Sequence, residues 1–505
     1  MIESVMEGFV LILQWQNIVA IVLGLYMGCV IGALPGLSPS MAIAIAAPFT
    51  FGLPPIPAIS FLLGIYKGGV YGGSISAILL CTPGTPEAAA TLMDGYPLSK
   101  QGKARQALDA ALYASIAGDL IGTVVLVGAA PFIAHYALKI GPVEMVPLIF
   151  LAMTVIITTL GDEKNKGFIA AAIGGLVALM GVDPIAGSTR FVFGNYELSE
   201  GVSLIPFLVG LFAVPEVITA IIASRERRRL KEAADTVEVH GERLPFSALL
   251  RHWKTVVQSA LVGSGIGALP GLGSTAAAFT CYGLAKKTSK NPEKFGTGSI
   301  EGVLACETGN NGTCGPALIP LLTLGIPGSS TTAVLYGTLL IYGIVPGPKI
   351  FIENGPTVYA IFIGLVISGL LLYPIGTSIT KYAAKGIYKV NQGLLFASIL
   401  LLCFTGSYAI GNSMIDVYCM AAAGIFAYGM RYFGLPLGPA LIAFILEPII
   451  EKSFRQALMI SNNDMGTFFS SPIAIGLWVV TAMLLLYGPI KSMRAKRGAA
   501  QGSQQ

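Results

Sequence analysis

The segment IGALPGLSPS at residues 31–40 returns as IGALPGLGST at residues 266–275, and this repetition decides the fold. A second pair of motifs follows in the same order and at nearly the same spacing, LLCTPGTPEAAAT at 79–91 and LLTLGIPGSSTTA at 321–333. Two motifs that recur in one order indicate an internal duplication. The apolar stretch 466–489 has no counterpart in the first half, so it is interpreted as an added terminal helix.

Composition places both halves in a membrane. Of the 505 residues, 54% are hydrophobic and only 11% are charged, whereas soluble proteins carry about 25% charged residues. The 62 glycines and 30 prolines suit membrane helices that pack closely and are often broken. We therefore expect an all-α, polytopic membrane protein of two repeats with discontinuous helices or re-entrant hairpins and one extra C-terminal helix.

The same composition argues against an enzyme. The seven cysteines have no CxxC spacing, and the three histidines have no second metal-type ligand at a useful spacing. HExxH, GxSxG and Walker-loop motifs are missing from the sequence. We therefore expect no catalytic metal, no organic cofactor and no direct use of ATP by this chain. Basic residues lie between apolar runs rather than in an aromatic-basic patch, so no nucleic acid is expected as a partner.

The basic residues also predict the orientation, because Lys and Arg collect on the cytoplasmic side of a membrane protein. The central segment RERRRLKEAAD (225–235) and the tail KSMRAKRG (491–498) are strongly basic. When the predicted membrane crossings are counted outward from these two cytoplasmic segments, KKTSKNPEK (286–294) lies inside and its uncharged counterpart GLPPIP (52–57) lies outside. Each half then crosses the membrane an odd number of times. The halves are therefore expected to be inverted, with a periplasmic N-terminus and a cytoplasmic C-terminus.

The predicted organisation has five parts. They are a first transmembrane repeat (1–224), a cytoplasmic basic linker (225–254), a second, inverted transmembrane repeat (255–452), an extra C-terminal transmembrane helix (453–490) and a cytoplasmic tail (491–505). Inverted repeats whose helices are interrupted by Gly and Pro at matching places point to the binding site of a transporter. Irregular backbone at membrane depth survives only where protein buries it or where it lines a cavity.

The first pair of breaks comprises GALPGLSPS (32–40) and GALPGLGST (267–275). Each ends an apolar helix and then supplies hydroxyls at the start of another, where a hydroxyl can cap the helix and leave N–H groups free for an anion. One copy alone is better explained as a plain helix-turn-helix with a capping serine, but two equivalent copies favour a binding role. The expected substrate-binding residues are Ser38, Ser40, Ser274 and Thr275, and the expected backbone or hinge residues are Gly32, Pro35, Gly36, Gly267, Pro270 and Gly271.

The second pair comprises residues 64–91 and 307–332. Each copy has a polar, Gly-rich start, an apolar stretch long enough for half a membrane, a TxG-x-P break and a second polar cluster. Each is therefore expected to form a helical hairpin or a discontinuous helix. The expected substrate-binding residues here are Ser74, Thr82, Thr85, Asn310, Asn311, Ser329, Ser330 and Thr331, and the expected hinge residues are Gly84, Pro86, Gly325 and Pro327.

Lys67 is the basic residue expected inside the membrane, where a lone lysine costs about 3 kcal/mol on insertion scales. Such a residue is a functional candidate, so Lys67 is expected to meet a substrate carboxylate. Two alternatives stay open: the side chain reaches the interface, or it pairs with Glu87 or Asp94.

Glu307 is the single carboxylate of the ETGNNG segment. With Asn310 and Thr323 it is expected to bind the coupling cation, either by giving oxygens to Na⁺ or by taking up a proton. The alternative is a structural partner for a basic residue. Other acidic residues lie in or near apolar runs, and the sequence does not rank them: Glu87, Asp94, Asp119, Glu144, Glu216, Asp416 and Glu447.

Three long motifs resemble the large membrane subunit of the tripartite tricarboxylate transporters: YGGSISAILLCTPGTPEAAATLMDGYPLSKQGKA, ETGNNGTCGPALIPLLTLGIPGSSTTAVLYG and GIVPGPKIF. The resemblance extends over about residues 10–490. It implies a secondary transporter of the bacterial inner membrane that works with a small four-helix membrane subunit and a periplasmic solute-binding protein. It also implies import of citrate or similar di- and tricarboxylates, driven by a gradient of Na⁺ or H⁺. A stand-alone ion or anion exchanger, or a channel without a binding protein, stays open as the alternative.

Overall fold

The computed structural model describes residues 2–183, 185–222, 241–386 and 392–486. Within these ranges the chain is almost entirely helical, and the strands β1 (Gly181–Val182) and β2 (Thr189–Arg190) form one short antiparallel hairpin. Four helical segments of the described chain are long and apolar enough to cross a bilayer: Trp15–Gly32, Ala88–Ala137, Gly355–Lys381 and Gly393–Gly411. The predicted class, an all-α membrane protein, is confirmed.

Two parts of the predicted organisation are not decided by the structure. The inverted relation of the two halves stays a prediction. The tail 491–505 lies outside the described residues, and so does the predicted cytoplasmic linker up to residue 240.

The chain folds into two compact units. Unit 1 comprises Met1–Ala134 and Ser203–Gly429, and unit 2 comprises His135–Val202 and Met430–Gln505. Each unit takes segments from both sequence halves, so compact units and repeats divide the chain differently. The predicted boundary at residue 452 falls inside a continuous helix of unit 2, α21 (Leu437–Ile460).

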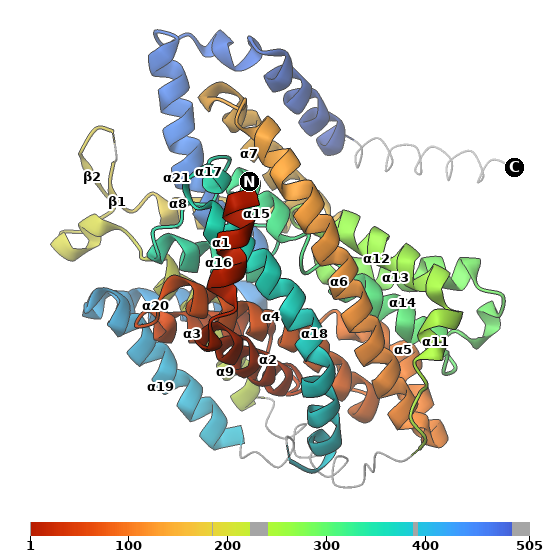
Figure 1. Cartoon of the computed structure of the whole chain (residues 1–505). Coiled ribbons are helices and arrows are strands. Elements are labelled where there is room, and N and C mark those ends of the chain that lie inside the picture. Colours follow the sequence, from red (N-terminus) through yellow and green to blue (C-terminus); the bar gives the residue numbers. More distant parts are fainter. Residues whose placement is uncertain (1, 184, 223–240, 387–391, 487–505) are drawn as a thin grey trace, which may run out of the picture. The chain divides into compact units, whose positions relative to one another are not determined.

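Unit 1 contains most of the helices (Figure 1). They are α1 (Ile2–Ile12), α2 (Trp15–Gly32), α3 (Pro39–Thr50), α4 (Pro55–Leu80), α5 (Ala88–Leu98), the π-helical turn η1 (Ser99–Lys103), α6 (Ala104–Ala137), α9 (Leu204–Ile222), α11 (Ser247–Arg251), α12 (Trp253–Gly267), α13 (Gly273–Thr288), η4 (Pro292–Lys294), α14 (Ile300–Asn311), α15 (Leu318–Leu324), α16 (Ser330–Ile341), α17 (Ile350–Glu353), α18 (Gly355–Gly386), α19 (Gln392–Gly411) and α20 (Met414–Tyr432).

Unit 2 contains the β-hairpin and fewer helices. They are α7 (Pro142–Thr158), η2 (Gly161–Glu163), α8 (Lys164–Ala178), η3 (Tyr196–Glu200), α21 (Leu437–Ile460), η6 (Met465–Phe469) and an apolar helix over Pro472–Leu486.

Glycines hold α2 directly against α4. Gly24, Gly28 and Gly32 recur at every fourth position of α2, on one face of the helix. A Cβ atom on Gly28 would lie 2.4 Å from the carbonyl oxygen of Ile65, and one on Gly32 would lie 2.2 Å from that of Gly69. Small residues at this spacing let membrane helices approach backbone to backbone. The end of α2, where the first break begins, is thereby fixed against the middle of α4.

The second half repeats this packing between α12 and α14. A Cβ atom on Gly263 would lie 2.3 Å from the carbonyl oxygen of Gly309, and one on Gly267 would lie 2.7 Å from that of Thr313. The corresponding break is therefore fixed in the same way.

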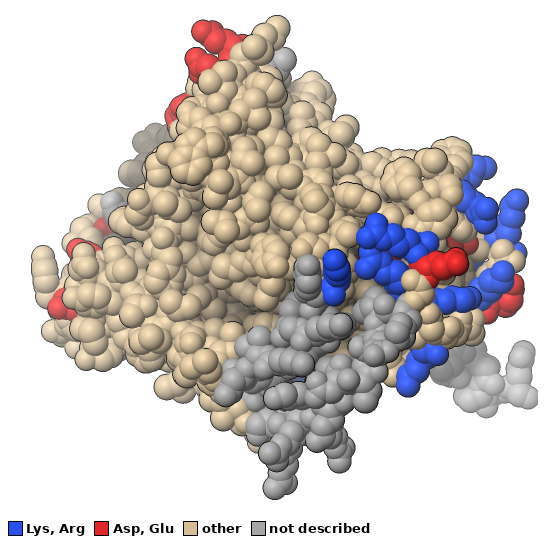
Figure 2. All heavy atoms as spheres, turned by 60° about the horizontal axis from the view of Figure 1, so that its bottom comes forward, with Lys and Arg blue, Asp and Glu red and all other residues tan. Residues whose placement is uncertain are grey.

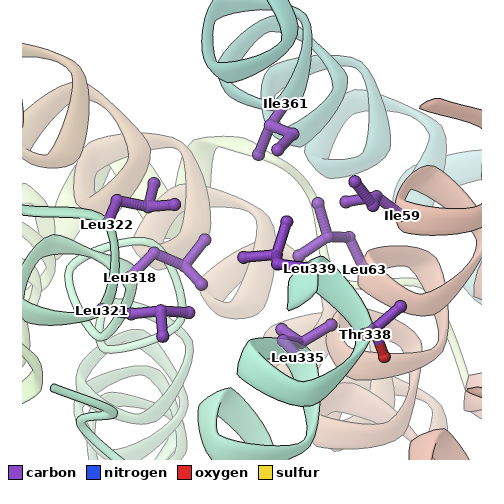
Figure 3. A pocket seen from close by; sticks show the side chains of 9 residues that line it. All are labelled: Ile59, Leu63, Leu318, Leu321, Leu322, Leu335, Thr338, Leu339 and Ile361. Atoms are coloured by element: carbon purple, nitrogen blue, oxygen red, sulfur yellow. The ribbon is translucent and has the colours of Figure 1, made fainter. Parts of the chain in front are cut away.

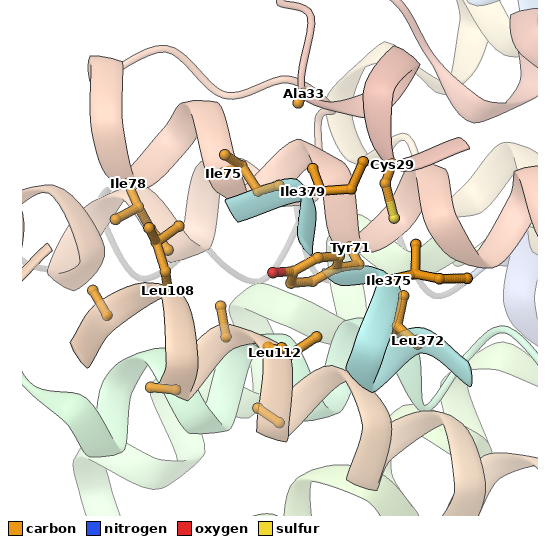
Figure 4. Close-up of a cluster of buried hydrophobic side chains, with 14 of the residues drawn as sticks. Cys29, Ala33, Tyr71, Ile75, Ile78, Leu108, Leu112, Leu372, Ile375 and Ile379 are labelled. Atoms are coloured by element: carbon orange, nitrogen blue, oxygen red, sulfur yellow. The ribbon is translucent and has the colours of Figure 1, made fainter. Parts of the chain in front are cut away.

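An apolar cluster between α2, α4, α6 and α18 forms the core of unit 1 (Figure 4). The ring of Tyr71 on α4 lies among Leu112 of α6 and Leu372 and Ile375 of α18. All four side chains are buried. The cluster brings α6, from the first half of the sequence, together with α18 from the second.

A group of ion pairs fixes the β-hairpin of unit 2. Asp183 pairs with Arg190 at 2.5 Å and with Arg455 at 2.9 Å, and both arginines also pair with Glu451. The backbone N–H of Ala186 and that of the residue before it donate to the Asp183 carboxylate. These N–H groups and the two guanidinium groups hold the pKa of Asp183 well below its usual value.

Candidate functional site

Both copies of the first break occur where the sequence predicts them. Helix α2 ends at Gly32 and α3 begins at Pro39, and α12 ends before a second helix that starts at Gly273. Gly36 and Gly271 occupy equivalent positions and have left-handed φ angles of 87° and 86°. A left-handed conformation costs an L-residue about 1–2 kcal/mol, so the backbone geometry favours glycine at both places.

The capping prediction holds in the first copy and is wrong in the second. Ser38 is the N-cap of α3, and its hydroxyl accepts a hydrogen bond from the Met41 N–H at 3.2 Å. The equivalent position in the second copy is Gly273, which has no side chain to offer. Helix α13 accordingly starts without a side-chain cap, and the two predicted hydroxyls, Ser274 and Thr275, lie inside its first turn.

The two copies of the second break differ. In the first copy the Gly-rich segment belongs to the continuous helix α4, which ends at Cys81 with a φ of 57°. The chain then breaks at the TxG-x-P motif and resumes as helix α5 at Ala88, so a break occurs in this copy as predicted. It follows the Gly-rich segment instead of interrupting it. In the second copy the helix is discontinuous as predicted: α14 ends before Pro316, and α15 ends at Gly325 with a φ of 72°.

Within each half the two breaks meet. The Gly84 N–H donates to the Gly73 carbonyl at 3.2 Å, and a Cβ atom on Gly84 would lie 2.0 Å from the carbonyl oxygen of Gly32. In the second half the Gly271 N–H donates to the Gly328 carbonyl at 2.9 Å.

One contact then joins the breaks of the two halves. The hydroxyls of Ser40 and Thr331 form a buried hydrogen bond of 2.9 Å. Ser40 lies in the first turn of α3, and Thr331 lies in the first turn of α16, whose N-cap is Ser329 with a capping box to Thr332. The structure therefore brings together two predicted site residues from opposite halves of the sequence.

Helix α14 carries buried polar atoms without a hydrogen-bond partner in the described chain: both amide atoms of Asn310 and the hydroxyl of Thr308. Leaving a buried donor or acceptor unsatisfied costs about 1–3 kcal/mol. Thr308 was not among the predicted site residues, although the repeat places it opposite Lys67.

Lys67 is buried, with 1% of its surface exposed. Its ammonium donates to Asp119 Oδ2 at 2.7 Å and to the Leu365 carbonyl at 2.5 Å. Both alternatives are therefore wrong, since the side chain does not reach the interface and its partner is neither Glu87 nor Asp94. Two of the three ammonium donors are in use. Contact with a substrate carboxylate stays a prediction, and it requires Asp119 to move or to be neutralised.

Asp94 bonds to backbone N–H groups and a tyrosine instead of to Lys67. Its Oδ1 accepts hydrogen bonds from the backbone N–H groups of Gly296, Gly298 and Ser299, at 2.8–2.9 Å. The Tyr282 hydroxyl donates to its Oδ2 at 2.9 Å. Asp94 thereby fixes α5 to the segment that starts α14.

Glu307 is completely buried and is held by side chains of four helices. Its Oε1 accepts from Ser74 of α4 at 2.5 Å and from Thr91 of α5, and its Oε2 accepts from Ser115 of α6 at 3.2 Å and Asn311 of α14 at 3.4 Å. Sequence reasoning named Ser74 and Asn311 but missed Thr91 of α5 and Ser115 of α6.

The other residues predicted for the cation do not bond to Glu307. Both amide atoms of Asn310 lack a hydrogen-bond partner in the described chain, and the Thr323 hydroxyl donates to the Ile319 carbonyl of its own helix. Among the remaining predicted hydroxyls, Thr82 donates to the Leu80 carbonyl at 3.3 Å, and Thr85 is buried beside Gly73.

An apolar pocket lies between α4, α15, α16 and α18 (Figure 3). Leucine and isoleucine side chains and Thr338 line it, and its volume is about 10 Å³. That is room for one water at most. This pocket does not fit an organic acid.

Exposed basic side chains gather on one part of the surface (Figure 2). Those of unit 1 that belong to η1, α13, η4 and the turn between the last two are Lys100, Lys103, Lys286, Lys287, Lys290 and Lys294. The predicted topology assigns all six to the cytoplasmic side.

Closely packed, broken helices with buried polar groups at their breaks are typical of membrane transporters. The chain belongs to the tripartite tricarboxylate transporter TctA family, which it matches over residues 18–442. This membership implies a transporter rather than an enzyme.

Two relatives come from Agrobacterium vitis. The chain is 34% identical over 502 residues to an uncharacterized 52.8 kDa protein in the TAR-I ttuC' 3' region, with 98% of each chain covered. It is 36% identical over 235 residues to an uncharacterized protein in the TAR-II ttuC' 3' region, which covers 46% of this chain and 97% of the relative. No solved structure matches the chain.

Proposed function

We propose that this chain is the large membrane subunit of a secondary transporter that imports citrate or similar di- and tricarboxylates with a cation gradient. The observation that carries the proposal is the hydrogen bond between Ser40 and Thr331. It joins the first turns of α3 and α16, and the first turn of a helix has free N–H groups and the positive end of the helix dipole. Such ends bind anions. Two helix N-termini that one hydrogen bond joins therefore suit a ligand with several carboxylates.

The buried polar atoms of α14 support the same proposal. The amide of Asn310 and the hydroxyl of Thr308 both offer donors that have no partner within the described residues. A carboxylate that entered between the helices would satisfy such donors. Ser38 and Ser329 keep the role of capping the two helix ends.

The partners and the location follow from the family. We propose that the chain lies in the bacterial inner membrane, works with a small four-helix membrane subunit and receives its substrate from a periplasmic solute-binding protein. The support is the membership in a tripartite family.

Reconstitution tests this function. The full chain is placed in proteoliposomes with the small subunit and the binding protein, and uptake of radiolabelled citrate and of a panel of carboxylates is measured under an ion gradient. Ser40→Ala and Thr331→Val each remove one of the joining hydroxyls and should lower uptake about fivefold, since one hydrogen bond contributes about 1 kcal/mol. Thr405→Val is the matched control, because its hydroxyl bonds only within its own helix. No uptake by the complete wild-type system would refute the proposal.

The proposed orientation has a separate test. Single cysteines at 286–294 should react with an impermeant reagent from the cytoplasmic side, and those at 346–356 from the periplasmic side, in a chain without its native cysteines. A periplasmic location of 286–294 would contradict the inverted arrangement.

A further inference from the structure

We propose that Glu307 is the group that binds the coupling proton, so that the cation gradient used by this protein is a proton gradient. The inference rests on the proposed function as a secondary transporter. In each transport cycle the Glu307 carboxylate takes up one proton to become a neutral carboxylic acid and later releases it on the other side.

The first argument is the lack of a counter-charge. Glu307 is 0% exposed, and no Lys, Arg or His of the described residues forms an ion pair with it. Its hydrogen-bond partners Ser74, Thr91, Ser115 and Asn311 are all neutral. An ionised carboxylate at membrane depth without a partner is costly. A protonated one is not, so this arrangement favours the neutral acid.

The surrounding titratable groups of the described chain supply no counter-charge. Glu87 at the start of α5 is a second buried carboxyl group, not a cation. Asp119 of α6 is already neutralised by Lys67. The groups that face this region from the packed elements are Tyr71 on α4, Glu87 and Asp94 at α5, Asp119 on α6, Cys281 and Tyr282 on α13, and Cys306 on α14 itself.

The second argument is that the hydrogen bonds of the carboxyl group suit a neutral acid, with one oxygen held tightly and the other loosely. The Ser74 hydroxyl lies 2.5 Å from Glu307 Oε1, at hydrogen-bond distance. Oε2 has the looser contacts, 3.2 Å to Ser115 and 3.4 Å to Asn311. A proton on Oε2 would be donated to Ser115, whose hydroxyl can accept as well as donate.

The third argument is a candidate path for the proton. The Tyr71 hydroxyl is completely buried among apolar side chains, and it has no hydrogen-bond partner in the described chain (Figure 4). Tyr71 lies on α4 one turn before Ser74, whose hydroxyl donates to Glu307. The Tyr71 hydroxyl is therefore the candidate for the next group on the proton path.

The decisive experiment compares Glu307→Gln with Glu301→Gln in the complete system in proteoliposomes. Glutamine reproduces the shape of the neutral acid but has no proton that it can release by ionising. Glu301 is a matched control on the same helix. Like Glu307 it accepts hydrogen bonds from hydroxyls, those of Thr255 and Ser289 at 2.8 and 2.6 Å, but its side chain is 17% exposed. Two reactions are followed with radiolabelled citrate: accumulation driven by a pH gradient, and exchange of internal for external citrate without a gradient.

For Glu307→Gln we expect accumulation to fall at least tenfold and exchange to stay within about threefold of the wild type. Glu301→Gln should keep both reactions. Two results would overturn the proton site. One is that the wild type accumulates citrate in response to a Na⁺ gradient but not in response to a pH gradient. The other is that Glu307→Gln shows full pH-driven accumulation. Absence of citrate exchange in the wild type would instead refute the transport function itself, and the proton site with it.

Two further measurements do not depend on that variant. Citrate added to wild-type proteoliposomes that contain a pH-sensitive dye should move protons together with citrate, and citrate uptake without proton movement would overturn the inference. Tyr71→Phe removes only a hydroxyl and should slow pH-driven accumulation about tenfold. An unchanged rate would exclude Tyr71 from the path.

Discussion

Replacing Lys67 by methionine tests the buried ion pair most directly. The change keeps the length of the side chain but removes the charge that Asp119 contacts at 2.7 Å. Asp119 is 1% exposed, and its Oδ1 already has no partner in the described chain. Breaking a buried pair by removing one partner costs about 3–5 kcal/mol, because an uncompensated charge stays behind. We expect Lys67→Met to lose about this much stability.

The double variant Lys67→Met/Asp119→Asn should recover most of the loss. It has no buried charge, and replacing both members of a buried pair is often close to neutral. Stability is measured on purified protein in detergent by thermal and chemical denaturation, and a double-mutant cycle gives the interaction energy. Lys166→Met is the control, since it removes an exposed ion pair to Glu163 that contributes at most about 1 kcal/mol.

Transport by the folded double variant then tests the predicted role of Lys67 towards the substrate. If the ammonium also meets a carboxylate, the apparent KM for citrate should rise about tenfold to a hundredfold, since charge-assisted hydrogen bonds contribute about 1–3 kcal/mol. Wild-type stability in Lys67→Met would refute the ion-pair argument. Wild-type transport kinetics in the double variant would remove Lys67 from the binding site.

Three other changes have defined outcomes. Gly36→Val and Gly271→Val should abolish citrate uptake while the protein stays in the membrane, since both positions have left-handed φ angles. The control is Gly265→Ala, at a helical position with open space around it, which should transport normally. Normal uptake by both valine variants would show that these loops only connect helices. Asp94→Ala leaves three backbone N–H groups unsatisfied and should lower the stability measured by denaturation by about 3 kcal/mol or more; a change below 1 kcal/mol would contradict its role as an anchor. Asp183 has a lowered pKa, so its stabilising effect is complete above the unfolded value of about 3.9 and is lost as the pH falls below it. Thermal unfolding at pH 7 should therefore separate the wild type from Asp183→Asn, and the difference should shrink below pH 4; a difference that grows on acidification would refute this assignment.

The glycine breaks are a feature that the sequence predicted correctly, because their cause is local. A Pro-Gly step ends a helix wherever it lies, and the two copies give nearly identical φ angles at Gly36 and Gly271. The membrane class is equally local in origin, since it follows from the apolar composition of each helix. The sequence also contains the reason why α3 has a side-chain cap and α13 has none, since Ser38 has a hydroxyl and Gly273 at the equivalent place has none.

Only the tertiary structure decided which polar groups meet. The sequence could not rank Asp119 among the acidic residues, nor could it show that Ser115 and Asp119, one turn apart on α6, reach Glu307 and Lys67. It likewise gave no sign that Ser40 and Thr331 share a hydrogen bond across the two halves.

The physical reason is the way in which membrane helices pack against one another. No hydrophobic force orients an apolar helix among lipids, so close packing of small residues fixes its rotation. On α6 a Cβ atom at Gly118 would lie 2.3 Å from the Thr308 carbonyl oxygen, and one at Gly122 would lie 2.6 Å from that of Gly312. These contacts set the face that α6 turns to α14. The sequence by itself determined the breaks and the membrane class, and the fit of glycines on one helix to carbonyls on another decided the partners of the buried charges.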